Sequence, residues 1–179
     1  MNLPSVTQIL SPFSDFSKIR PDVLEAAAAK GTRVHTACAT LARGGWPVVA
    51  PEEQGYVDSF LRWFSRVEQV HHIEEEFRDE AMGFMGHPDL VVTWEGKFSL
   101  WDLKTPRSAS PTWSGQLAAY RRLVTWNVDP PERTAALILD PKGGTPKCVD
   151  LSDPDRAFAA FLGALTAYKF FYKGGKADE

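Results

Sequence analysis

Hydrophobic positions change their spacing several times along this chain, and each change predicts a secondary-structure element. After a short extended opening, Pro21 leads into a helix over residues 22–43, either continuous or bent near Gly31, which a pair of glycines closes. Beyond Pro51, apolar side chains recur every three or four positions, as in a helix that faces a core. The side chains of this second stripe are Tyr56, Phe60, Trp63, Phe64 and Val67.

The middle of the chain has the alternation of β-strands. A first strand is predicted from His71 through Phe77. Two runs rich in β-branched and aromatic residues follow at 87–94 and 98–105, separated by residues 95–97. We therefore expect three strands in succession.

The remainder of the chain alternates helix and strand. Helical patterns cover residues 112–126 and 153–173, and between them lie a buried strand at 134–140 and an edge strand at 147–151. This order of elements predicts an α/β protein with a mixed central β-sheet flanked by helices. A length of 179 residues fits one domain over residues 1–179.

Composition narrows the class of protein. Hydrophobic residues make up 44% and charged residues 24% of the chain, which excludes disordered, fibrous and coiled-coil proteins. No apolar run approaches the roughly 18 to 20 residues that span a bilayer, so no membrane partner is expected. Cys38 and Cys148 are too few for a disulfide framework or a four-cysteine metal site, and a reducing cytoplasm is expected. The formal net charge of -3 argues against tight, unassisted binding to DNA.

Candidate chemistry begins with an acidic-x-Lys pattern. Three such triplets occur, at residues 95–97, 102–104 and 140–142. Only Asp102 and Lys104 lie inside a predicted strand, where a spacing of two places both side chains on one face. They form either an ion pair within the strand or part of a site.

The turn between the two central strands decides between these readings. A two-residue turn at 95–96 places Asp89 opposite Asp102, whereas a three-residue turn places Asp89 opposite Leu103 and on the other face. Opposed carboxylates repel unless a cation lies between them, and Mg²⁺ or Mn²⁺ prefers such oxygen ligands. A bound cation lowers the pKa of a water, and Lys104 is placed to orient that water or help to deprotonate it.

A longer ordered set of residues extends this candidate site. It consists of Asp89, Asp102-Leu103-Lys104 and the helical Gln116-x-x-x-Tyr120. This set resembles the PD-(D/E)xK nuclease superfamily, and in particular its RecB-like and phage exonuclease branch. Gly31-x-x-x-His35 and Glu74 are similar to that branch's helix motif and strand glutamate. The resemblance spans about residues 4–173 and implies a restriction-endonuclease-like core in the order αβββαβ.

The resemblance also implies a role for each residue. The implied ligands of Mg²⁺ or Mn²⁺ are His35, Asp89, Asp102, the backbone carbonyl of Leu103 and Glu74. Glu75 and Glu76 adjoin Glu74, so the register decides which of the three faces the site. The implied catalytic residues are Asp89, Asp102, Lys104, Gln116 and Tyr120. Gln116 and Tyr120, four residues apart on one helical face, would fasten the site and touch the scissile phosphate.

Each of these residues also has a structural explanation. His35 on an alanine-rich helix is compatible with a core or surface histidine. Gln116 and Tyr120 are compatible with helix surface and helix core, and Glu74 with a solvated acidic strand. An ion pair between Asp102 and Lys104, however, leaves Asp89 unexplained.

The predicted activity is metal-dependent hydrolysis of DNA phosphodiester bonds by a metal-activated water. The resemblance favours an exonuclease of phage-type recombination or DNA processing, in the cytoplasm of a bacterium or of a phage host. A structure-selective endonuclease and a non-catalytic nucleic-acid-binding or interaction module are the alternatives. With two cysteines the chain resembles the members that lack an iron-sulfur cluster.

Basic residues near the candidate site could bind DNA phosphates although the net charge of the chain is negative. The residues expected to contact DNA are Arg33, Arg107, Arg121 and Tyr120. Trp101 and Trp113 flank the site in sequence and either stack on bases or pack in the core. Because the net charge is negative, a recombination partner protein or a homo-oligomer is expected to help hold the DNA.

Overall fold

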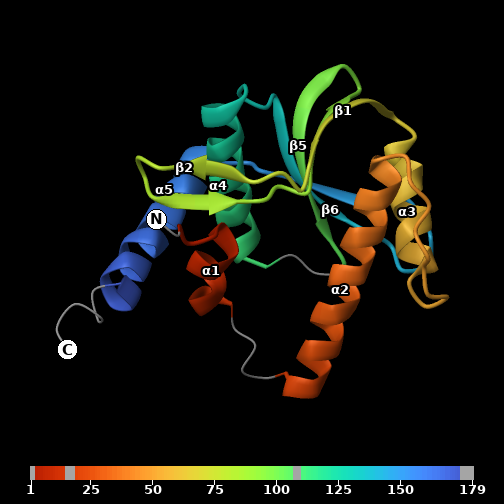
Figure 1. Cartoon of the computed structure of the whole chain (residues 1–179), viewed down its shortest axis with the longest axis horizontal. Helices are drawn as coiled ribbons and strands as arrows, with labels where there is room; N and C mark the ends of the chain where they lie inside the picture. The colour runs from red at the N-terminus through yellow and green to blue at the C-terminus, as the bar shows by residue number, and fades with distance from the viewer. Residues whose placement is uncertain (1–2, 15–18, 107–109, 174–179) are drawn as a thin grey trace.

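A five-stranded mixed β-sheet lies between two groups of helices in the computed structural model of the chain, which describes residues 3–14, 19–106 and 110–173 (Figure 1). The strands, in their order across the sheet, are β1 (Val67–Ile73), β4 (Leu90–Trp94), β5 (Lys97–Lys104), β6 (Arg133–Ile138) and β7 (Lys147–Asp150). Only β5 and β6 pair in parallel. The predicted class, an α/β protein with a mixed sheet flanked by helices, is confirmed.

The helices form two layers. They are α1 (Val6–Leu10), α2 (Pro21–Ala42), α3 (Gln54–Phe64), α4 (Thr112–Asn127) and α5 (Pro154–Tyr168). In Figure 1, α1, α4 and α5 lie to one side of the sheet, and α2 and α3 lie to the other. Within the described ranges, no helix is long and apolar enough to cross a membrane.

Each face of the sheet has its own hydrophobic core. Successive strand residues point to opposite faces, so the alternation in β4 and β5 divides their side chains between the two layers. Val91 and Leu100 belong to the core shared with α1, α4 and α5. Leu90 and Trp101 belong to the core shared with α2 and α3. A strand residue two positions before or after one of these four points to the same face as that residue.

The start of the chain differs from its prediction. Instead of an extended opening, residues 6–10 form α1, and a 3₁₀ turn, Ser11–Phe13, follows. Ser5 and Gln8 cap α1 reciprocally, because each side chain bonds the backbone of the other residue. Three apolar side chains of α1 then complete the core under α4.

The region after β1 also differs from its prediction. Val67 starts β1 rather than extending the helical stripe, and the strand ends at Ile73 instead of running to Phe77. Glu74 has a φ of 50°, a left-handed conformation that breaks a strand. The chain then forms a small hairpin of β2 (Phe77–Asp79) and β3 (Phe84–Gly86). Elsewhere α2 runs through Gly31 as one helix.

Helix α4 anchors this small hairpin. Asp79 is fully buried, and its carboxylate accepts hydrogen bonds from the backbone of Met82 at 2.9 Å and from Arg122 Nε of α4 at 3.0 Å. On β3, Gly86 lets the buried ring of Tyr120 approach the strand backbone closely. The hairpin therefore has one fixed position against α4.

This close approach makes Gly86 sensitive to substitution. An alanine Cβ there would lie 2.7 Å from Tyr120 Cε1 and 3.0 Å from Leu123 Cδ1. We expect Gly86→Ala to lower the free energy of unfolding by about 1 to 3 kcal/mol. Thermal unfolding measures this as a decrease in melting temperature of about 2 to 4 °C per kcal/mol.

Gly163→Ala is the matched control, because a Cβ at this position of α5 would meet no atom within 4 Å. In a helix interior this change favours folding by up to about 1 kcal/mol. A Gly86→Ala protein that melts at or above the wild-type temperature would contradict the packing described.

Candidate active site

The register of the central hairpin brings Asp89 opposite Asp102. Trp94 pairs with Lys97, which leaves a two-residue turn. Glu95 and Gly96 in this turn both have positive φ, 50° and 73°, as a type I′ hairpin turn requires. The ladder continues to Leu90 opposite Trp101, and Asp89 is the next residue along. The two-residue turn is confirmed.

Asp102 and Lys104 point to the face covered by α4, because they follow the core residue Leu100 by two and four positions. Asp89 lies just before β4. Lys104 Nζ lies 2.6 Å from Asp102 Oδ2. It also donates a hydrogen bond of 2.8 Å to Gln116 Oε1.

Gln116 connects this pair to helix α4. Its Nε2 donates to Asp102 Oδ1 at 3.4 Å and to the hydroxyl of Tyr120 at 3.3 Å. Lys104 Nζ also lies 5.3 Å above the centre of the Trp113 ring. The four predicted residues Asp102, Lys104, Gln116 and Tyr120 thus form one connected group.

Asp102 occupies an unfavourable position for a carboxylate. The residue is 3% exposed, and burial raises its pKa, an effect that Asp89 reinforces and the charge of Lys104 opposes. Its Oδ2 forms an ion pair of 2.6 Å with Lys104 Nζ and has no further partner among the described residues. Burying such a pair is costly, because both charged groups lose their contact with water.

Asp89 is held by its neighbours on two sides. Its Oδ2 accepts a hydrogen bond of 2.6 Å from the backbone nitrogen of Leu103, and its Oδ1 lies 3.2 Å from Nδ1 of His35 on α2. In a strand, the N–H and C=O of one residue point to the same edge. The carbonyl of Leu103 therefore points to the same edge of β5 as its N–H, which bonds Asp89.

The carboxylates also affect His35. Burial of the ring lowers its pKa, but the charge and contact of Asp89, together with the charge of Asp102, outweigh burial and the repulsion by Lys104. The net result is a raised pKa for His35. The contact with Asp89 therefore stabilises the protonated imidazole relative to that of a free histidine.

Of the three adjacent glutamates, Glu74 lies nearest this group. It lines a pocket of about 370 Å³ together with His35, and its backbone nitrogen donates to the carbonyl of Asp89 at 3.1 Å. Its carboxylate lies 3.3 Å from Arg43. Glu75 instead pairs with His72, and Glu76 with Arg78 and His87.

The donors fit a hard divalent cation in their chemistry. Across the described part of the chain, no three His, Cys, Asp or Glu side chains stand close enough together to hold a metal as they are. The two facing carboxylates, the imidazole of His35 and the carbonyl of Leu103 are nevertheless ligands suited to Mg²⁺ or Mn²⁺. The buried carboxylate of Asp102, whose Oδ2 pairs with Lys104, would supply one of the oxygen ligands.

The residues predicted to contact DNA have varied surroundings. Arg33 forms an ion pair of 2.6 Å with the buried Glu53 but remains about half exposed. Arg121 donates to the carbonyl of Pro131. Tyr120 is buried under Gln116, and burial raises its pKa. Arg107 lies outside the described residues.

The two tryptophans that flank the site in sequence, Trp101 and Trp113, pack in the core. Trp101 is fully buried against Trp63 and Trp94, with ring centres 5.0 and 5.3 Å away. Stacking of Trp101 on a base is therefore wrong as a prediction. Trp113 is 9% exposed and packs beneath Lys104.

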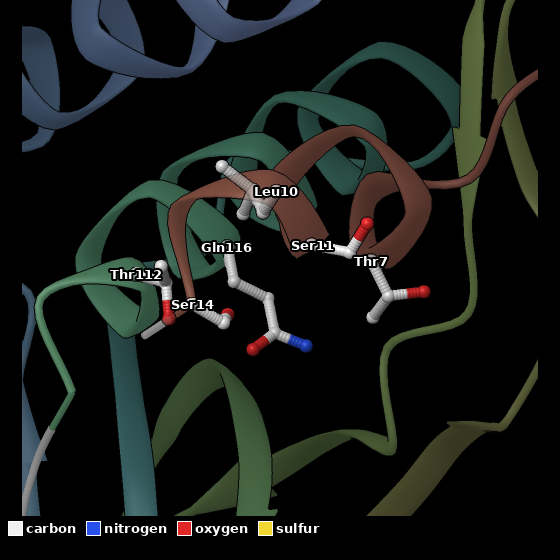
Figure 2. A pocket seen from close by; sticks show the side chains of 6 residues that line it. All are labelled: Thr7, Leu10, Ser11, Ser14, Thr112 and Gln116. Atoms are coloured by element: carbon white, nitrogen blue, oxygen red, sulfur yellow. The ribbon is translucent and has the colours of Figure 1, made fainter. Parts of the chain in front are cut away.

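A pocket beside Gln116 was not predicted. Figure 2 shows this pocket of about 160 Å³ between α1, the turn that follows it and the start of α4. The described residues that line it are Thr7, Leu10, Ser11, Ser14, Thr112 and Gln116. The capping pattern from Ser5 to Gln8 is the sequence signal that could have revealed α1 and hence this wall.

Comparison with known proteins leaves the family open. No model of a protein family matches the chain, and no curated protein sequence matches it. The resemblance in the motifs therefore rests on the residues themselves.

The raised pKa of His35 predicts how stability depends on pH. Protonated His35 stabilises the fold below its unfolded-state pKa of about 6.5, and this contribution is lost as pH rises through the folded-state pKa. We expect the free energy of unfolding of the metal-free protein to decrease above about pH 6.5 for this reason. His35→Gln should lack this part of the decrease in urea titrations with EDTA.

His71→Gln is a control in which the pKa shift of the replaced histidine has the opposite direction. Burial, with the charge of His72, lowers the pKa of His71, so its contribution changes only below about pH 6.5. Parallel pH profiles for wild type and His35→Gln would contradict the assigned contact with Asp89.

Proposed function

We propose that this chain is a Mg²⁺- or Mn²⁺-dependent deoxyribonuclease of the PD-(D/E)xK superfamily, with a restriction-endonuclease-like core. The motif residues that resemble this superfamily, the αβββαβ order around the mixed sheet and the grouping of Asp102, Lys104, Gln116 and Tyr120 support the proposal. An exonuclease of phage-type recombination or DNA processing is the preferred form.

One observation carries the proposal: a buried carboxylate, Asp102, pairs with Lys104 at 2.6 Å and lies opposite a second acidic residue, Asp89. A buried ion pair of this kind contributes little to stability, because the cost of removing both charges from water offsets their attraction. Costly groups of this kind gather at functional sites. A cation between Asp89 and Asp102 accounts for both carboxylates at once.

The chain's residues divide the work of hydrolysis. Asp89, Asp102, the Leu103 carbonyl and His35 would hold the cation, which when bound lowers the pKa of a water and offsets charge on phosphate oxygens. Lys104 projects beside Asp102 and can orient the attacking water and offset the charge of the phosphate. Gln116 holds the Lys104 ammonium in position through its Oε1.

Binding of DNA requires positive charge beyond that of the site residues. Arg33 and Arg121 already bond within the chain, so part of their capacity to bind phosphate is engaged. With a net charge of -3, the chain gains from a recombination partner protein or from assembly with copies of itself. A cytoplasmic location is part of the same proposal.

Nuclease assays test the proposal directly. We expect the wild-type protein with Mn²⁺ or Mg²⁺ to degrade DNA, and Asp102→Asn and Lys104→Ala each to lose at least about 100-fold in rate, equivalent to about 2.7 kcal/mol. Linear and closed circular substrates, single- and double-stranded, are compared. Cutting of linear DNA alone identifies an exonuclease.

Lys142→Ala is the matched control, because Lys142 belongs to an acidic-x-Lys triplet in a turn and its side chain is exposed to solvent. It should retain wild-type activity. If the wild-type protein leaves every substrate intact with both cations, or the two site variants cut as well as it does, the proposal is wrong.

A stability measurement separates lost chemistry from lost folding. Because burial raises the pKa of Asp102, folding disfavours its charge at neutral pH. Asp102→Asn keeps the shape and removes the charge, so we expect the metal-free protein to melt about 2 to 4 °C higher, or about 1 kcal/mol. Differential scanning calorimetry in EDTA measures the change.

Lys104→Ala should have the opposite effect, since it leaves the buried carboxylate unpaired. A loss of about 3 to 5 kcal/mol is typical of this change. An Asp102→Asn protein less stable than the wild type would show that the ion pair outweighs burial.

A further inference from the structure

The pocket beside Gln116 adjoins the proposed active site but contains none of the implied metal ligands. In Figure 2 the carboxamide of Gln116 lies between Ser14 and Thr112 on one side and Thr7 and Ser11 on the other. The Oε1 of the same carboxamide is 2.8 Å from Lys104 Nζ. A group bound in the pocket would therefore lie one side chain away from Lys104.

The described lining is uncharged and rich in hydroxyl groups. The Ser11 hydroxyl donates its proton to the carbonyl of Gln8 at 3.0 Å, so its oxygen is left to accept from a ligand. Thr7 Oγ1 lies 3.1 Å from Ser5 Oγ, and Ser5 Oγ accepts from the backbone nitrogen of Gln8. The proton of Ser5 can then go to Thr7, which frees the Thr7 proton for a ligand.

These bonding roles select the chemistry of the ligand. A phosphate offers acceptors only and would meet the acceptor oxygen of Ser11 unfavourably. A hydroxyl group both donates and accepts, which matches Ser11 and Thr7 together. The methyl groups of Leu10 supply an apolar side to the pocket.

Size sets a second limit. About 160 Å³ is smaller than the roughly 300 to 1,000 Å³ of pockets that enclose a whole drug-sized ligand. The pocket therefore takes a part of a ligand, such as a five-membered sugar ring.

We propose that this pocket binds the hydroxyl-bearing sugar of a nucleotide next to the scissile phosphate. The inference rests on the proposed function, which places a phosphate beside Lys104. An internal deoxyribose has no free hydroxyl, so the hydroxyl comes either from a 3′-terminal nucleotide or from the 2′ position of a ribose. The pocket is then a specificity-determining subsite.

Three labelled single-stranded oligonucleotides of one sequence test this assignment. The first ends in a 3′-hydroxyl, the second in a 3′-dideoxy nucleotide, and the third combines the dideoxy end with one internal ribonucleotide. Fluorescence anisotropy in EDTA measures their binding to the wild-type protein without metal-dependent cleavage. We expect the preferred hydroxyl source to bind about 3- to 10-fold tighter than the dideoxy DNA, the effect of one or two hydrogen bonds.

Removal of the pocket hydroxyls should abolish this preference. In the Thr7→Val, Ser11→Ala double variant the affinity ratio should fall to about 1, with binding of the dideoxy DNA unchanged. Ser65→Ala is the matched control, because Ser65 donates to the carbonyl three residues earlier, as Ser11 does, at the far end of α3. The control should keep the wild-type ratio.

The outcomes separate this proposal from the nuclease proposal. A wild-type protein that binds all three DNAs equally, or binds none, overturns the sugar subsite, as does an unchanged ratio in the double variant. A preference for the 3′-hydroxyl or for the ribonucleotide identifies the source. Cleavage with Mn²⁺ is measured separately, so discrimination without cleavage keeps the pocket and refutes the nuclease.

Discussion

The two-residue turn at Glu95 and Gly96 governs the direction of every strand side chain in the candidate site. Positive φ at both positions gives the hairpin a twist that suits the sheet and leaves one register. In that register Asp102 and Lys104 share the face below α4, and Asp89 lies opposite Asp102 at the end of the hairpin. A slip of one residue would turn Asp102 toward the opposite core, where Trp101 now packs.

The helices add side chains to the strand residues that this register brings together. Helix α4 contributes Gln116 and Tyr120, and the same helix holds the β2–β3 hairpin through Arg122 and Asp79. The residues just before Asp89 are thus tied to the helix that contacts Lys104. Rigid elements on both sides of a polar group hold it in one geometry, as catalytic positioning requires.

The elements that sequence could predict are those with long, regular patterns. The apolar stripes of α2 and α3, the β-branched runs of β4 and β5 and the turn between them have local causes, and the structure contains them. The short strands β2 and β3 depend on packing against α4, which a local pattern does not carry, whereas α1 has a local signal in its capping box. Ion pairs between residues distant in sequence could not be predicted from a local pattern either, as for Glu53 with Arg33 and Asp79 with Arg122.

The burial of Asp102 also has an evolutionary consequence. A neutral side chain at this position would relieve the cost of a buried charge. In a lineage without selection for what this charge does, substitutions that remove the carboxylate would therefore meet little resistance from the fold. The fold by itself gives no reason to keep an acid at position 102.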